Sequence, residues 1–144
     1  MLYSIIVPVY NRPGEVKELL DSLMAQTVKP FELLIIEDGS KERCDHLLGH
    51  YRSFFTIHYF YKENSGRSET RNYGMQRANG DYLLFFDSDV ILPPTYFAKL
   101  EAEMASLEQI GCPAYLQEEL PLPMSTVGGI KVEGQAQFHP LKFA

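Results

Sequence analysis

Short runs of hydrophobic residues alternate with helical stripes along the chain, and this alternation predicts its secondary structure. The first run, residues 3–9, is rich in β-branched side chains, as expected of a strand buried inside a parallel sheet. The next apolar side chains have the spacing of one helix face and lie at positions 16, 19, 20, 23 and 24. Asn11 is the predicted cap of this helix, and Pro13 fits its first turn. We therefore expect a central strand followed by a helix.

The same strand-and-helix unit recurs three times. Further strands are expected at residues 31–36, 56–61 and 82–86, the last ending on Asp87. Further helices are expected around residues 44–51, 69–78 and 97–111. Strands that alternate with helices at this spacing imply parallel pairing with right-handed crossovers. The predicted fold is α/β, with a Rossmann-like, mostly parallel sheet flanked by helices.

The pattern weakens after Gly111. Pro113, Pro121 and Pro123 interrupt the chain, and residues 125–132 are the remaining segment able to pair as a strand. A long stretch without secondary structure is unusual inside a compact domain. We interpret residues 1–110 as an α/β region and residues 111–144 as an incomplete segment of the same domain, either truncated at its end or shortened internally.

Composition narrows the class of protein. With 144 residues, 45% of them hydrophobic, the chain has room for one ordinary domain. Its net charge of −6 argues against a nucleic-acid partner, which needs clustered cations. Cys44 and Cys112 lack the spacing of a metal site, so two reduced thiols and a cytoplasmic location are expected. The apolar residues 2–10 are broken by Pro8, follow no basic segment and are too few to span a bilayer, so neither a leader nor a membrane span is expected. Peripheral attachment at the inner membrane face is left to other parts of a longer protein.

Polar residues follow the predicted strands where each strand ends. They are Tyr10-Asn11, Glu37-Asp38 and Asp87-Ser88-Asp89. Open α/β sheets bind ligands at this edge, and side chains two apart in extended chain point the same way. Asp87 and Asp89 can therefore present two carboxylates together, which favours Mg²⁺ or Mn²⁺. A solvated acidic turn is the alternative interpretation.

Three other polar positions admit two readings each. Asp38 either makes a local turn or accepts hydrogen bonds from a ligand. Arg67 and Arg71 lie one helical turn apart, where they can bind a diphosphate or form surface ion pairs.

The sequence contains neither GxxxxGK[ST] nor GxGxxG after the first strand. Their absence argues against a P-loop ATPase and against a dinucleotide dehydrogenase.

Four blocks together closely resemble the family 2 glycosyltransferases of the GT-A fold. They are residues 5–11 (IIVPVYN), 37–40 (EDGS), 64–72 (NSG with Arg71-Asn72) and 86–89 (FDSD), in the order and rough spacing of that family. The resemblance covers residues 3–100, and its specificity comes from the combination. By this resemblance residues 1–110 would bind a nucleotide-diphosphate sugar, and residues 111–144 would belong to the acceptor side.

The resemblance also implies roles for individual residues. The nucleotide would contact Pro8, Val9, Tyr10, Asn11, Asp38, Arg71, Asp87 and Ser88. Of these, Asp38 would hydrogen-bond the base, commonly uracil, and Arg71 would lie near the diphosphate. Asp89 would hold Mn²⁺ or Mg²⁺. The reaction implied is inverting transfer of a sugar to the hydroxyl of a carbohydrate or glycoconjugate acceptor, as in cell-surface polysaccharide synthesis.

The catalytic base of such a transferase is the missing part. Glu118-Glu119 lacks the expected context, so the base is expected beyond Ala144, and the chain is expected to bind donor nucleotide yet transfer sugar poorly. Two alternatives remain open. One is a non-catalytic nucleotide-sugar-binding module. The other is a phosphatase resembling the haloacid dehalogenase family, because residues 84–90 also fit an apolar strand followed by DxDxV.

Overall fold

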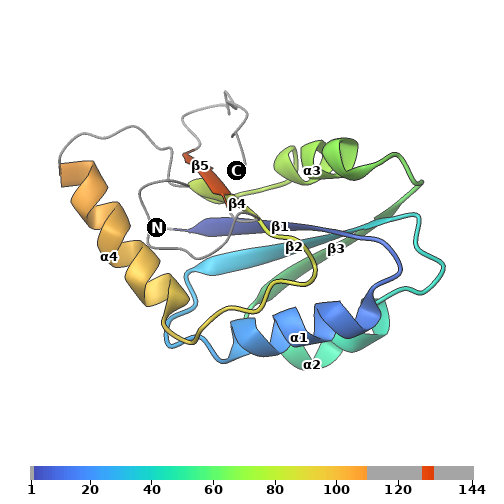
Figure 1. Cartoon of the computed structure of the whole chain (residues 1–144), viewed down its shortest axis with the longest axis horizontal. Coiled ribbons are helices and arrows are strands. Elements are labelled where there is room, and N and C mark those ends of the chain that lie inside the picture. Colours follow the sequence, from blue (N-terminus) through green and yellow to red (C-terminus); the bar gives the residue numbers. More distant parts are fainter. Residues whose placement is uncertain (1, 110–127, 132–144) are drawn as a thin grey trace.

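The computed structural model describes residues 2–109 and 128–131. Within these ranges one five-stranded sheet has the order β3-β2-β1-β4-β5 (Figure 1). Its strands are β1 (Tyr3–Val9), β2 (Phe31–Asp38), β3 (Thr56–Lys62), β4 (Tyr82–Phe85) and β5 (Gly128–Lys131). The helical elements are α1 (Pro13–Met24), η1 (Asp45–Leu47), α2 (Leu48–Tyr51), α3 (Arg67–Met75) and α4 (Tyr96–Gln109).

The first strand is central, as predicted. β1 pairs in parallel with β2 on one side and with β4 on the other, so that Ile5 lies between Leu33 and Leu84. β3 continues the parallel arrangement beyond β2, whereas β5 runs antiparallel to β4. The predicted mostly parallel α/β sheet is confirmed.

Successive side chains of β1 point to opposite faces of the sheet, and each face has its own hydrophobic core. Tyr3, Ile5 and Val7 face the larger core, which includes the buried side chains of α1 and α4. Ile6 faces the smaller core together with residues of β2 and β4. Figure 1 shows α3 on one side of the sheet and α1 with α2 on the other. Because both faces are covered, the strands carry continuous apolar runs rather than alternating ones.

Helix α3 lies very close to the sheet because it carries a glycine at the contact. A Cβ atom added to Gly74 would stand 2.6 Å from Cγ2 of Ile6 and 2.9 Å from Cδ1 of Ile36. Such distances are shorter than any ordinary van der Waals contact. The close approach brings the beginning of α3 near the ends of the parallel strands.

One local prediction was wrong, and one helix is shorter and less regular than its pattern suggested. Asn11 does not cap α1: it adopts a left-handed backbone conformation with φ of 52°, and the residue before the helix is Arg12, which makes no side-chain cap. The helical segment expected over residues 44–51 is present, as the short η1 followed by a single turn, α2. Gly49 lies within that turn, and glycine weakens a helix through its large conformational freedom.

The end of the chain is described in part. The strand expected within residues 125–132 is confirmed as β5. Glu118, Glu119 and most of the segment 111–144 lie outside the described residues. Among the helices that are described, none has the length and apolar character needed to cross a bilayer.

Candidate functional site

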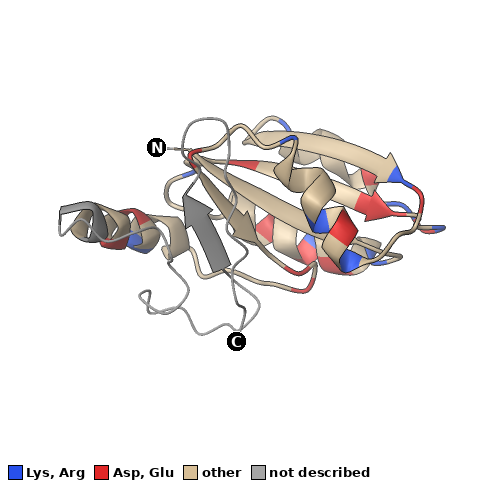
Figure 2. Ribbon diagram, turned by 90° about the horizontal axis from the view of Figure 1, so that it is seen from above, with Lys and Arg blue, Asp and Glu red and all other residues tan. Residues whose placement is uncertain are grey.

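The predicted site residues meet at one edge of the sheet. β1, β2 and β4 are neighbours and parallel, so their carboxyl ends open at the same edge. Asn11, Asp38 and Asp87 come from these three strand ends or from the turns just after them. Figure 2 shows acidic and basic positions together around the strand arrowheads. This is the edge at which open α/β sheets bind ligands.

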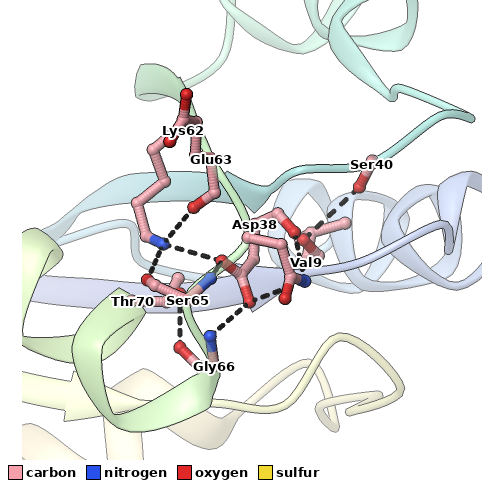
Figure 3. Close-up of polar contacts among 9 residues, drawn as sticks. Val9, Asp38, Ser40, Lys62, Glu63, Ser65, Gly66 and Thr70 are labelled. Carbon is pink, nitrogen blue, oxygen red and sulfur yellow. Dashed lines mark hydrogen bonds and ion pairs between the residues drawn. The ribbon is translucent and has the colours of Figure 1, made fainter.

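Asp38 is the most heavily hydrogen-bonded side chain of the site (Figure 3). Its Oδ1 accepts from Lys62 Nζ at 2.7 Å and from the Ser65 amide at 2.8 Å. Its Oδ2 accepts from the Gly66 amide at 3.1 Å and from Asn64 Nδ2 at 3.3 Å. A carboxylate offers about four acceptor positions, so the protein occupies them all.

The charge of Asp38 follows from this environment. Burial acts to raise its pKa, but the hydrogen bonds from Lys62, Ser65 and Gly66 outweigh burial and lower it below its usual value. Asp38 is therefore an anion at neutral pH. The expected hydrogen bond from a nucleotide base to Asp38 stays a prediction, and a base that donates to this carboxylate would have to displace one of its four donors.

A glycine allows the loops around Asp38 to approach each other. Gly39 has φ of 76°, and a Cβ atom added there would stand 2.8 Å from the Asn64 amide nitrogen. Gly66 has φ of 97° and lies immediately before α3. Both positions favour glycine because other residues rarely adopt such backbone angles. The EDGS and NSG blocks therefore fit together as backbone segments.

The turn after β1 is tied to the turn after β2. The Asn11 amide donates to Ser40 Oγ at 2.9 Å, and Asn11 Oδ1 accepts from the amides of Lys41 at 2.7 Å and Glu42 at 3.0 Å. The Asn11 side chain thus connects two loops, in place of the helix cap predicted for it. Its contact with a nucleotide remains untested.

The three residues before Asn11 differ in what they can offer a ligand. Tyr10 is 51% exposed, so its ring is accessible. Pro8 is half-buried. Val9 is 1% exposed and its side chain belongs to the larger core, so its backbone is the part that can face a ligand.

Asp87 and Arg71 are brought together, as expected for two residues of one site. Arg71 Nη2 lies 3.5 Å from Asp87 Oδ1, and Arg67 Nη1 lies 3.9 Å from the same oxygen. Burial lowers the pKa of Arg71, the charge of Asp87 raises it, and Arg67 lowers it. The guanidinium remains charged because arginine is so strongly basic. Two cationic groups therefore face the end of β4, where a diphosphate could bind.

Ser88 and Asp89 have different surroundings. Ser88 Oγ donates to Glu15 Oε2 on α1 at 3.2 Å, and Glu15 also pairs with Arg12 at 2.9 Å. Asp89 is exposed, and its carboxylate forms no hydrogen bond or ion pair with residues 2–109 or 128–131. Ser88 is thus held by α1, whereas Asp89 is available to an external cation.

The chemistry of the donor set fits Mg²⁺ or Mn²⁺. In the described part of the chain, no three His, Cys, Asp or Glu residues gather as a preformed metal cage. Mg²⁺ commonly binds through one or two carboxylates plus phosphate oxygens and waters, and Asp89 with its hard oxygen atoms suits that mode. The fit therefore depends on a phosphate-bearing ligand completing the shell.

Sequence reasoning missed two residues of this edge. Lys62 is the parallel-register partner of Asp38, the last residue of β3 opposite the last residue of β2. Its place at the end of an apolar run was the signal that could have found it. Glu15 lies on the first turn of α1, and its contact with Ser88 depends on how that helix packs, which no local pattern shows.

The sequence is similar to known glycosyltransferases. A family model described as Glycosyl transferase family 2 matches residues 4–119. An uncharacterized glycosyltransferase of Rickettsia felis is 39% identical over 106 residues, which cover 74% of this chain and 17% of that protein. The uncharacterized glycosyltransferase EpsJ of Bacillus subtilis is 35% identical over 119 residues, which cover 81% of this chain and 35% of that protein. The chain thus spans about a third or less of the length of these relatives.

The fold is similar to solved GT-A glycosyltransferases. Residues 1–349 of S. aureus TarS match with a TM-score of 0.70 and 28% identity, covering 75% of this chain and 33% of that one. TarS has also been solved in complex with UDP-GlcNAc and with UDP. The mannosyltransferase PcManGT of Pyrobaculum calidifontis, solved with GDP-Man and Mn²⁺, matches with a TM-score of 0.67 and 16% identity, covering 90% of this chain and 44% of that one. At that identity the likeness concerns the fold alone, and the expected GT-A fold is confirmed.

Proposed function

Because the chain belongs to glycosyl transferase family 2, we propose that it binds a nucleotide-diphosphate sugar at the carboxyl edge of its sheet and serves sugar transfer to an acceptor hydroxyl. The observation that carries this proposal is the meeting of Arg71 and Asp87, 3.5 Å apart, beside the loops that surround Asp38. Anion-binding cations and exposed hard oxygen donors at one edge suit a diphosphate with its cation.

The donor lies across three strand ends in this proposal. The nucleoside side comprises Pro8, Val9, Tyr10, Asn11 and Asp38, with the exposed Tyr10 ring and the backbone of Val9 as its accessible parts. The diphosphate and sugar side comprises Arg71, within α3, and Asp87 and Ser88, which follow β4. A nucleotide-sugar therefore spans from β2 to β4.

A UDP-sugar is the donor that we propose. TarS, at 28% identity over a match that covers 75% of this chain, has been solved with UDP-GlcNAc and with UDP. The GDP-Man complex of PcManGT concerns a protein only 16% identical, so it carries less weight for the base.

Asp89 would hold the divalent cation, Mn²⁺ or Mg²⁺. Such a cation supplies charge neutralisation for a departing nucleoside diphosphate. Arg71 would contribute to the same neutralisation directly; the proximity of its guanidinium to Asp87 supports a role beside the diphosphate. Asp87 in turn keeps Arg71 oriented.

We further propose an inverting transfer to a carbohydrate or glycoconjugate acceptor, in cell-surface polysaccharide synthesis at the cytoplasmic side of the membrane. The base that deprotonates the acceptor hydroxyl is expected beyond Ala144. Asp38 and Asp87 are already engaged by Lys62 and by Arg71. That engagement argues against either carboxylate as the base.

Calorimetric titration with UDP and Mn²⁺ tests the donor site. Wild-type protein should bind UDP with Mn²⁺, and D89A should weaken this binding by about tenfold or more, because one charged metal ligand is lost. D45A is a matched control, since Asp45 is an exposed carboxylate of η1 paired with Arg43. No binding to wild type, or equal binding by D89A, would refute the assignment.

A non-catalytic donor-binding module is the second candidate function. The observation in its favour is that Asp38 and Asp87 are both engaged, by Lys62 and by Arg71, which argues against either as the base. UDP release from a UDP-sugar, measured with and without Mn²⁺, separates the two: release above the uncatalysed rate indicates a transferase or hydrolase, and binding without release indicates a module. The family match over residues 4–119 removes the support for the phosphatase alternative.

A further inference from the structure

We propose that Lys62 is a positioning residue of the donor site, which acts through Asp38 and the loop 63–66 to place Arg71 against Asp87. This inference rests on the proposed donor-binding function and concerns a residue with no assigned role. Lys62 would touch neither the sugar nor the cation. Its effect on the diphosphate would be transmitted by contacts that can be followed atom by atom.

The first step is the anchoring of Lys62 itself. It is the register partner of Asp38 on the adjacent parallel strand, so both side chains leave the sheet on the same face. The Lys62 side chain is 12% exposed and the Asp38 side chain 9%. Lys62 Nζ donates to Asp38 Oδ1, to the Glu63 carbonyl at 2.9 Å and to Ser65 Oγ (Figure 3). All three donor positions of the ammonium group are therefore used.

The second step connects Asp38 to the start of α3. Asp38 accepts from the amides of Ser65 and Gly66, the two residues that precede the first residue of the helix. Gly66 is the residue at the helix N-cap position, and its carbonyl accepts from Thr70 Oγ1 at 2.7 Å. The loop 63–66 is thus held by Asp38 of the sheet and by Thr70 of the helix. These two sets of contacts fix the residue at which α3 begins.

The third step leads from α3 to the end of β4. Arg67 is the first residue of α3 and Arg71 lies one turn later, so their side chains leave the same face of the helix. Both guanidinium groups reach the same oxygen of Asp87, at 3.9 Å and 3.5 Å. A shift or rotation of the helix start would move both cations relative to Asp87. Contacts at the ends of β2 and β3 therefore determine where the Arg67 and Arg71 guanidinium groups lie relative to Asp87, which follows β4.

Charge makes Lys62 necessary for this arrangement. Without the ammonium group, Asp38 would be a nearly buried anion held only by amide donors, and such an uncompensated charge is costly. It would recover hydration by opening toward solvent or by taking a proton. Either change releases the amides of Ser65 and Gly66 and frees the start of α3.

The experiment is a double-mutant cycle on UDP binding with Mn²⁺. K62M keeps most of the side-chain volume but removes the charge and all three donors, whereas K62R retains the charge. R71M removes the guanidinium group that faces Asp87. K17M is the matched control, because Lys17 is an exposed lysine on α1 paired with Asp21.

If Lys62 acts through Arg71, K62M weakens UDP binding about tenfold, and K62M/R71M binds no more weakly than R71M alone. K62R should recover most of the affinity, and K17M should bind as wild type does. Effects of K62M and R71M that multiply, or unchanged binding by K62M, would overturn the inference.

Amide hydrogen exchange provides a readout that does not need the ligand. K62M should speed exchange about tenfold or more at residues 65–71, with β1 unchanged, because the loop opens locally. Unchanged exchange there would overturn the inference even if UDP binds. Failure of wild type to bind UDP, with accelerated exchange in K62M, would instead count against the donor assignment while leaving the positioning role intact. If K62M does not fold, K62Q replaces it, with the same outcomes required.

Discussion

The Ser4 hydroxyl donates a hydrogen bond of 2.6 Å to the buried carboxylate of Glu32, at the edge of the sheet opposite the candidate site. The same carboxylate accepts from the amide and side chain of Asn79 and pairs with His58. These contacts join β1, β2 and β3 to the chain entering β4. Glu32 is therefore a stabilising residue that lies far from the candidate site. Substitutions at Glu32 should change the stability of the fold without removing a contact to the ligand.

Replacement of Glu32 by glutamine should destabilise the fold at neutral pH. A glutamine places an NH₂ group where Glu32 accepts hydrogen bonds, so a buried donor faces other donors, at a cost of about 2 kcal/mol. Urea unfolding at about pH 7 measures the change in the free energy of unfolding. E18Q is the control, because Glu18 is exposed on α1. Equal midpoints for E32Q and E18Q would contradict the prediction.

The effect of Glu32 should depend on pH. Burial acts to raise its pKa, but hydrogen bonds from Ser4 and Asn79 outweigh it, and the pKa is lower in the folded protein than in the unfolded chain. Its stabilisation is present above the unfolded-state pKa of about 4.3 and is lost as the pH falls through the folded-state pKa. The stability gap between wild type and E32Q should shrink from about pH 7 to about pH 3. A constant gap would refute the linkage.

Addition of one methyl group at Gly74 should destabilise the packing of α3. G74A would place a Cβ atom 2.6 Å from Ile6, and the sheet or the helix would have to shift, which costs about 1–3 kcal/mol. G14A is the matched control, since a Cβ atom there meets nothing within 4 Å and alanine favours a helix. Thermal unfolding should rank G74A below wild type and G14A at or above it. The reverse order would show that the contact relaxes without cost.

Asn11 should tolerate glycine better than alanine. Both substitutions remove the hydrogen bonds from the Lys41 and Glu42 amides, but only alanine is strained at φ of 52°. N11A should cost about 1–2 kcal/mol more than N11G in urea unfolding. Equal costs for N11A and N11G would mean that backbone strain at position 11 is negligible.

Cys44 should resist alkylation in the folded protein. Burial, followed by the negative charge of Glu37, raises the pKa of its thiol to about 12, and thiolate is the reactive form. In a C112S background, iodoacetamide at about pH 8 should modify Cys44 at least about a hundredfold more slowly without urea than with it. Rapid modification of the folded protein would show that Cys44 is accessible.

The sequence was sufficient for features that depend on local periodicity and on strand ends. The apolar run of β1 predicted a central parallel strand, and the polar residues after β1, β2 and β4 were correctly predicted to lie at one edge of the sheet. Arg71 and Asp87 were both expected at the donor site through the family resemblance, and the structure brings them within 3.5 Å of each other.

The features that were missed depend on contacts between loops. Asn11 has the residue type of a helix cap, but the neighbouring turn offers it the amides of Lys41 and Glu42, and those tertiary contacts prevail over the local preference. The link between Asp38 and Lys62 depends on strand register, which is set by the packing of two sheet faces. Local patterns do not contain that information.

The central position of β1 has a consequence for how quickly the native sheet can form. β1 is synthesised well before β4, which is its second neighbour, and the Leu2 amide contacts Asp81, 79 residues later in the chain. Contacts of such sequence separation carry a large loop-closure cost and slow the folding of a domain. Until β4 has been synthesised and has paired, the backbone groups on one side of β1 have no strand partner. The nascent chain is most prone to aggregation during that interval.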